Sequence, residues 1–201
     1  MDLTKYVAAK TVLNNDVHHI KRKDVSLQIH YWGLMPRHYD NQLHKHSFFE
    51  ICYVVDGEGT YLDEGRTYQL KESTIFFTRP EVLHQIKSTN GISLLYVAFQ
   101  LDESESTEKW IQLIDEAKNC MEIVLYDQYE SESVMLWKSL LIHATKHYNK
   151  FSKEILLNIA YCLIFSLLQD FVPNFNDTSK KINDEKYSTL LTQAQLYIHD
   201  N

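Results

Sequence analysis

Residues 44–57, HKHSFFEICYVVDG, carry the pattern from which the fold is inferred. Two histidines, His44 and His46, come before Glu50 and a strongly apolar run that ends in a turn. Successive side chains of an extended strand point to opposite faces, and positions 44, 46 and 50 share parity. The pattern predicts a buried strand at 48–55, with both imidazoles and the carboxylate directed to one side of the sheet.

Two imidazoles and a carboxylate on one face form a suitable ligand set for a single metal ion. Such ligands suit Fe, Mn, Ni or Zn and leave positions open for water or a substrate. His84, which comes after the next pair of strands, is a fourth potential ligand. The alternative is that these polar groups line a ligand pocket or are hydrogen-bonded within the sheet wall.

The first half of the chain alternates short β-rich runs with turn signals. Besides the strand at 48–55, strands are predicted at 25–32, 60–63, 66–70, 74–78 and 92–99. A loop is expected at 33–42, which contains a proline, and Glu64-Gly65 indicates a compact hairpin. Short strands at this spacing predict an antiparallel barrel or sandwich that spans residues 25–102.

Residues 103–173 are predicted to be helical, because glycine is absent after residue 100 and apolar residues recur at helical spacing. Helices are expected at 107–118, at 134–148 and, with Ser152 as the N-cap, up to Phe171. This last helix is apolar nearly all round, so it must be covered on more than one side. A second subunit is a natural cover, and burial within one chain is the alternative. The candidate dimer interface consists of Ile155, Leu156, Ile159, Leu163, Ile164 and Leu167.

The last part of the chain indicates a linker followed by a new helix. Residues 174–184 are polar. After them, one helical face is formed by Tyr187, Leu190, Leu191, Ala194 and Ile198. Little sequence remains for this face to pack against, so we expect residues 185–201 to begin a second domain of a longer natural protein. The alternative is a helix that folds back onto the preceding helices.

Composition indicates a globular protein of the cytoplasm. The chain of 201 residues is 44% hydrophobic and contains 13 Tyr, 9 Phe and 3 Trp, enough for a substantial core. Its three cysteines form no CxxC pair, which favours reduced thiols in the cytosol. The N-terminus lacks the apolar stretch of a signal peptide, and no apolar run approaches the roughly 20 residues that cross a bilayer. We therefore expect a cytoplasmic protein with no membrane partner.

The net charge of −7 argues against a domain that binds DNA by itself, because such domains are usually basic. The basic cluster Lys21-Arg22-Lys23 is short and is followed by Asp24, so we interpret it as a solvated loop. The sequence contains no GxSxG, Walker loop or GxGxxG, and these absences exclude the hydrolases and nucleotide-binding proteins that such motifs mark.

The pattern HxHxxxE, followed after six residues by Gly57, resembles the first motif of the cupins, and His84 stands where the second motif has its histidine. The order of barrel, helices, polar linker and further helix is similar to that of AraC-type (AraC/XylS) bacterial transcription regulators. This resemblance implies an α+β chain with an N-terminal cupin-like β-barrel (double-stranded β-helix) and a helical dimerisation region. Residues 1–24 would then be an N-terminal arm or lid. Where the cupin motifs have glycine or proline, this sequence has His38, Ser73, Arg79 and Glu81.

In AraC-type regulators the barrel binds a small-molecule effector and dimerises, and a C-terminal helix-turn-helix domain binds DNA. The resemblance implies a homodimer here, no enzymatic activity, no organic cofactor, and contact with DNA only through a C-terminal part that this chain lacks. Carried over to this sequence, the effector-binding positions are His44, His46, His84, Ile86, Leu94 and Tyr96.

Two further residues are effector-binding candidates. Trp32 lies on an early strand whose inward face the sequence does not determine. Arg79 lies at a strand end, where a guanidinium can bind a carboxylate or phosphate with two hydrogen bonds, although a surface arginine is the alternative. Leu94 and Tyr96 share parity, so they can face one cavity or belong to the core.

Two other functions remain open. The first is a metal-dependent cupin enzyme, a dioxygenase or isomerase, with His44, His46, Glu50 and His84 as the metal ligands. The second is a structural dimerisation module with an empty barrel.

Overall fold

The computed structural model describes residues 2–146 and 151–173. It contains a six-stranded sheet with the order β1-β2-β8-β3-β6-β9 and a three-stranded sheet with the order β5-β4-β7. All the strand pairs are antiparallel. The strands are β1 His19–Lys21, β2 Ser26–His38, β3 Phe49–Asp56, β4 Gly59–Asp63, β5 Arg66–Leu70, β6 Ile75–Thr78, β7 His84–Lys87, β8 Ile92–Leu101 and β9 Val124–Leu125.

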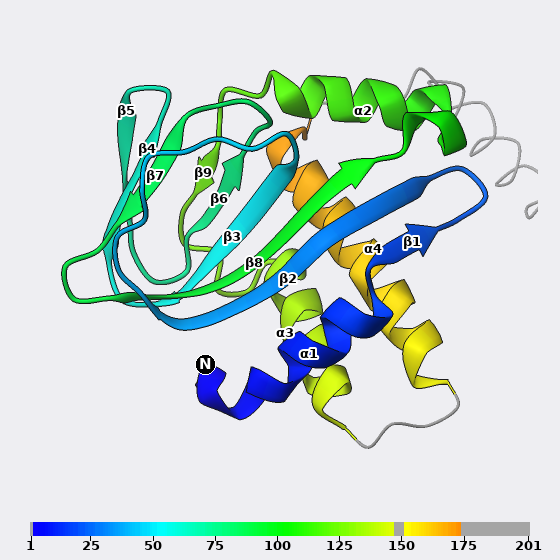
Figure 1. Cartoon of the computed structure of the whole chain (residues 1–201), viewed down its shortest axis with the longest axis horizontal. Coiled ribbons are helices and arrows are strands. Elements are labelled where there is room, and N and C mark those ends of the chain that lie inside the picture. Colours follow the sequence, from blue (N-terminus) through cyan, green and yellow to red (C-terminus); the bar gives the residue numbers. More distant parts are fainter. Residues whose placement is uncertain (1, 147–150, 174–201) are drawn as a thin grey trace, which may run out of the picture.

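The helices precede or follow the barrel, and α1, α3 and α4 pack together beside the larger sheet (Figure 1). The helical elements are η1 Leu3–Tyr6, α1 Val7–Asp16, η2 Glu103–Glu105, α2 Glu108–Lys118, α3 Glu132–Thr145 and α4 Ser152–Phe171. This arrangement confirms the predicted fold class, an antiparallel cupin-like barrel followed by a helical region.

The larger sheet has one face toward the smaller sheet and one toward the helices. The register aligns one row across β2, β8, β3 and β6 that consists of Gly33, Tyr96, Cys52 and Phe76. This row faces inward, because the ring of Phe76 lies 4.8 Å from that of Tyr61 on β4. The neighbouring row faces the helices, because the ring of Phe77 lies 4.9 Å from that of Phe171 on α4. Both faces are buried, as the mostly apolar sequence of β3 requires.

Strand β2 is longer than the sequence predicted, since it runs through most of the expected loop at 33–42. Pro36 is tolerated there because the register shifts between Met35 and His38, so the ladder loses no bond to the missing N–H. Gly33 marks a close contact rather than a turn. A Cβ at this position would lie 1.9 Å from the ring of Tyr96, so only glycine leaves room for that ring.

The segment expected to be an N-terminal arm packs on the rest of the domain in the residues described. Residues 3–21 form η1, α1 and β1, and the apolar side chains of this segment belong to the core. The side chain of Asn14 donates to the carbonyl of Trp32 and accepts from its N–H, at 2.8 and 3.0 Å. The indole of Trp32 also donates to the carbonyl of Val17 at 2.8 Å. The segment is therefore tied to β2 by hydrogen bonds as well as by apolar contacts.

Helix α4 has the predicted bounds, but most of its proposed dimer interface is covered by its own chain. Each of the side chains of Leu156, Leu163, Ile164 and Leu167 is 0% exposed, because α4 packs on α3 and the larger sheet. These four residues cannot contact a second subunit, which corrects the expected interface. Ile155 is 39% exposed and Ile159 is partly exposed.

By length and composition alone, α4 could cross a bilayer, which corrects the statement that no apolar run approaches that length. Here the helix packs inside the domain, and the core helix of a soluble protein passes the same test. The expected linker at 174–184 and the expected helix at 185–201 lie outside the described residues.

Replacement of Leu13 by alanine tests whether the N-terminal segment belongs to the core. Leu13 on α1 is 2% exposed. Its truncation leaves a cavity and should lower the free energy of unfolding by about 2–5 kcal/mol in urea titrations. Val7 on the same helix is 55% exposed, so Val7→Ala should change that free energy by less than about 0.5 kcal/mol. Equal, small effects of the two substitutions would mean that the segment is not packed.

Candidate ligand-binding site

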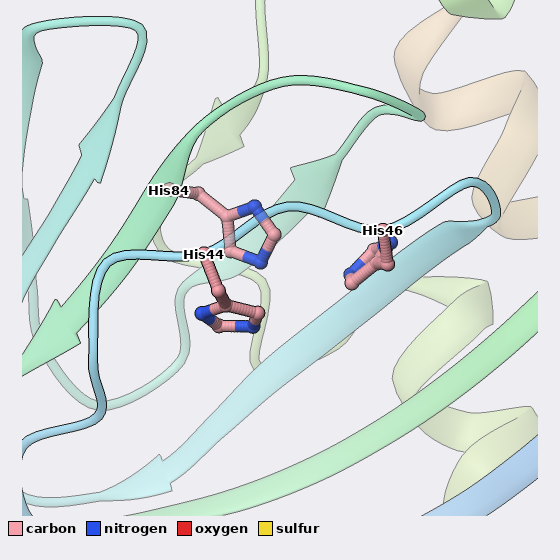
Figure 2. A group of neighbouring side chains, drawn as sticks. All are labelled: His44, His46 and His84. Atoms are coloured by element: carbon pink, nitrogen blue, oxygen red, sulfur yellow. The ribbon is translucent and has the colours of Figure 1, made fainter.

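Three histidines meet at one end of the smaller sheet, and they come from different parts of the chain (Figure 2). His44 forms an isolated antiparallel bridge with His84, the first residue of β7, through hydrogen bonds of 2.9 and 3.1 Å between their main chains. The rings of His44 and His84 lie 4.2 Å apart, and those of His46 and His84 lie 4.8 Å apart. We call His44, His46 and His84 the histidine cluster.

The histidine cluster forms for a different reason from the one inferred from parity. Strand β3 begins at Phe49, so His44 and His46 lie before it and not on it. The backbone bridge to β7 places His44, and the ring of His46 stacks on Phe48 at 4.0 Å. These residues do come together, but they do so because the backbone of His44 pairs with that of His84. The prediction that one extended strand carries His44, His46 and Glu50 is wrong.

Each imidazole of the cluster is held in one tautomer by the backbone. The Nδ1 atom lies 2.8 Å from a carbonyl oxygen in His44 and His46 and 2.9 Å in His84. A carbonyl can only accept, so Nδ1 carries the proton and Nε2 of the neutral ring keeps its lone pair. One ligand atom from each ring lies within 4.8 Å of the others. The cluster can therefore present three nitrogen lone pairs to one small region.

Burial keeps two of these rings uncharged at neutral pH. Burial lowers the pKa of His84 to about 4. The hydrogen bond to Val82 raises this pKa in part, and the neighbouring His44 and His46 lower it further. Burial also lowers the pKa of His46, although the carboxylate of Glu50 opposes it. Neutral imidazoles are the form that binds a metal ion or accepts a hydrogen bond from a ligand.

Glu50 extends the site from β3. Its Oε2 atom lies 3.8 Å from Nε2 of His46, too far for a hydrogen bond, and Nε2 is buried without a partner among the described residues. The hydroxyl of Tyr31 on β2 donates to Oε2, and the thiol of Cys52 donates to Oε1 at 3.3 Å. Burial and the negative charge of Glu50 raise the pKa of both Tyr31 and Cys52, so both remain protonated donors. His46 and Glu50 therefore face each other as two acceptors.

The other inward candidates lie on β7 and β8. Leu94 and Tyr96 lie on one face of β8, as their shared parity predicts. The ring of Tyr96 meets that of Tyr31 edge to face at 5.8 Å. Ile86 lies on β7 opposite Tyr61 of β4 and is 6% exposed. Leu94 and Ile86 offer only apolar surface, whereas Tyr96 also offers a hydroxyl.

Two candidates are corrected by their positions. The side chain of Trp32 lies on the opposite face of β2, where α1 covers it and its N–H is already bonded to Val17. The guanidinium of Arg79 is not available to bind a carboxylate or phosphate of a ligand. Its Nη2 donates to Asp63 at 2.7 Å and its Nη1 to the carbonyl of Cys120 at 3.0 Å, and its side chain is only 11% exposed.

Tyr31 was missed as a site residue, although its position in the strand predicted at 25–32 gave a usable signal. Trp32 and Tyr31 alternate on that strand, so one of them had to face inward. The sequence did not determine which of the two faced inward, and the hydrogen bond from the Trp32 indole to Val17 shows that Trp32 faces outward. A hollow of about 840 Å³ lies at the other end of the smaller sheet, beside Gly59, Lys71 and Tyr126. The histidine cluster is therefore distinguished by its chemistry and not by the size of a pocket.

Acidification should destabilise the protein through His84. The folded pKa of about 4 lies below the ordinary value of 6.5, so between these pH values only the unfolded chain binds this proton. The free energy of unfolding should fall as pH decreases from 6.5 to 4, and His84→Gln should make this dependence shallower. Urea unfolding across that range provides the measurement. The exposed His18 serves as the control, because His18→Gln should retain the wild-type slope; equal slopes for wild type and His84→Gln would contradict the assignment.

Comparison with known proteins places most of the chain in one family. The AraC-like ligand binding domain matches residues 25–160, more than half of the chain. An uncharacterized HTH-type transcriptional regulator, YfiF of Bacillus subtilis strain 168, is 46% identical over all 201 residues, which make up 64% of that protein. The chain thus spans slightly less than two thirds of this relative. An oxalate-binding protein of Thermotoga maritima is 37% identical over 57 residues, which are 28% of this chain and 47% of that protein.

Solved structures that are similar include an RmlC-like cupin from Shewanella frigidimarina, with 21% identity, a TM-score of 0.32, and coverage of 41% of this chain and 82% of that one. KdgF from a Halomonas species gives 21% identity, a TM-score of 0.31, and coverage of 41% and 76%. The family match rests on the sequence and agrees with the barrel and helices described above. The chain belongs to the family of AraC-like ligand binding domains.

Proposed function

We propose that this chain is the ligand-sensing part of a transcription regulator, and that its ligand binds at the histidine cluster and Glu50. The observation that carries the proposal is the buried Nε2 of His46, which has no hydrogen-bond partner within residues 2–146 and 151–173 and faces the carboxylate of Glu50 at 3.8 Å. Glu50 accepts from Tyr31 and Cys52, but Nε2 of His46 has no donor among the described residues, and a buried acceptor without a donor is unfavourable. A ligand that supplies a donor or a positive charge between them would relieve this.

The groups of the site restrict the chemistry of that ligand. The neutral imidazoles offer lone pairs, Glu50 offers a carboxylate, and the arginine nearest in sequence to this region, Arg79, is occupied by Asp63. Hydroxyl or amino groups therefore match the site better than a carboxylate or phosphate does. The rings of Tyr31 and Tyr96 provide the apolar surface that a small organic ligand also requires.

Strand β3 offers a route from the ligand to the helices. Glu50 faces inward, while its neighbour Phe49 faces outward and stacks on Phe77 at 5.4 Å. Phe77 in turn stacks on Phe171 of α4 at 4.9 Å. A ligand that binds one arrangement of β3 more tightly than another shifts the equilibrium between the corresponding positions of α4. The free energy of that shift equals the difference between the two binding free energies and cannot exceed it.

The partners proposed for this protein are inferred from its similarity to YfiF. YfiF is named as a helix-turn-helix regulator and is longer than this chain. DNA binding is thus proposed only for a further C-terminal part, in a cytoplasmic protein. A homodimer is proposed as well, and the α4 residues with surface left for it are Ile155 and Ile159.

A thermal-shift screen tests the sensing function. We expect at least one neutral polyol or amine, at roughly 100 times its Kd, to raise the melting temperature by about 5–10 °C, because binding adds about 2.7 kcal/mol. Carboxylates of similar size should have little effect. His46→Ala should abolish the shift, whereas the exposed control His18→Ala should keep it. A screen without any shift, or a shift that survives His46→Ala, would refute ligand binding at this site.

A metal-dependent function is the second candidate, and the convergence of one ring nitrogen from each of three histidines favours it. Hydrogen bonds from Nδ1 to backbone carbonyls orient metal-binding histidines in general. His44, His46 and His84 would hold the ion, with Glu50 as the nearest carboxylate. Bound there, the ion would supply Lewis-acid chemistry and open coordination positions.

Metal analysis separates this candidate from a purely organic ligand. Protein made without a His-tag and incubated with Ni²⁺, Mn²⁺ or Zn²⁺ should keep about one ion per chain after desalting, as expected for three nitrogen ligands. His84→Ala should lower this below about 0.2 ions, and His18→Ala should not. Retention of less than that amount by the unsubstituted protein would eliminate the metal function.

A further inference from the structure

Besides the histidine cluster, His38 at the end of β2 has a buried ring nitrogen. Its Nε2 atom has no hydrogen-bond partner in the part of the chain that the structure describes, as is also the case for Nε2 of His46. His38 stands where the first cupin motif has glycine, so its ring is an addition of this sequence. A buried polar atom without a partner is unfavourable in a folded protein and requires a physical explanation.

The strand register directs the side chain of His38 into the barrel. His38 lies opposite Ile92 of β8. Ile92 shares parity with Tyr96 along β8, and Tyr96 belongs to the inward row. Residues that lie opposite each other in an antiparallel pair have their side chains on the same face of the sheet. The ring of His38 is therefore on the inward face, which also carries Glu50 of β3.

The carboxylate of Glu50 connects His38 to the site described above. Burial lowers the pKa of His38, and the negative charges of Asp40 and Glu50 oppose this effect. Glu50 likewise opposes the effect of burial on the pKa of His46. One carboxylate thus acts on both imidazoles, which indicates that both rings lie near it inside the barrel. A neutral imidazole has one nitrogen that donates and one that accepts.

We propose that His38 is a further ligand-binding residue of this site and that it pairs with a hydroxyl group of the ligand. A hydroxyl both donates and accepts, so it satisfies Nε2 of His38 in either tautomer, whereas an ammonium group only donates. The inference rests on the proposed function, in which a first hydroxyl or amino group of the ligand lies between His46 and Glu50. The ligand class is thereby narrowed to compounds with two separated polar groups, namely polyols and amino alcohols.

Matched probe compounds, measured by isothermal titration calorimetry, test the second hydroxyl. The amino alcohols from ethanolamine to aminohexanol are each compared with the alkylamine of the same length, and the diols from ethylene glycol to hexanediol with the corresponding alcohols. In the unsubstituted protein at least one hydroxylated compound should bind about tenfold more tightly than its partner, as expected for one added hydrogen bond. The series that shows this preference identifies the first group of the ligand as an amine or a hydroxyl.

Variants of His38 test whether this residue recognises the hydroxyl. His38→Leu should reduce the affinity for the hydroxylated compound to that for its partner, because leucine fills a similar volume without a polar atom. His38→Gln keeps a group that donates and accepts, so it should retain part of the preference. His18→Leu, at an exposed position, should bind like the unsubstituted protein. His46→Ala should abolish the binding of both members of every pair.

The ligand-free protein provides a second measurement. His38→Leu should raise its melting temperature by about 2–8 °C, because the substitution removes a buried polar atom that has no partner. A lower melting temperature would mean that His38 is bonded within the fold, and it would overturn the inference. Equal binding within every pair, or a preference that survives His38→Leu, would also overturn it, but the proposed site would stand as long as His46→Ala abolishes binding. If no probe binds the unsubstituted protein, the proposed function is refuted together with the inference.

Discussion

The burial of β3 on both of its faces is the constraint on which the arrangement depends. Because neighbouring residues of a strand point in opposite directions, β3 directs Glu50 into the barrel and Phe49 and Ile51 toward the helices. The barrel can close only around the first face, and the helices can pack only on the second. A one-residue slip of β3 would exchange the two sets, so the polar site and the helical layer are specified together.

The sequence predicted the fold more reliably than the site. Alternation and turn residues located most strands to within two residues, and helical spacing located α2 and α4, because those signals are local. The length of β2 was underestimated, since Gly33 was taken as the start of a loop, whereas it accommodates the ring of Tyr96. The short strands β1, β7 and β9 were not predicted, because two to four residues carry no periodicity of their own.

Within the site, the residue types were informative and the geometry was not. His44, His46 and His84 do come together, but through a backbone bridge between segments 40 residues apart, which no local pattern reveals. The same limit applies to α4. A helix that is apolar nearly all round shows that several sides are covered, and only the packing of Leu163 and its neighbours shows that α3 and the sheet cover them.

The hydrogen bonds from each Nδ1 of the cluster to a carbonyl also affect selectivity. Rings held in this way have little rotational freedom left to lose, so a guest of the right dimensions is bound at a small entropic cost. For a ligand that is slightly too wide, the imidazoles cannot rotate to make room without breaking those hydrogen bonds. For the ligand site proposed above, the same hydrogen bonds would thus favour affinity and restrict the size of the ligand.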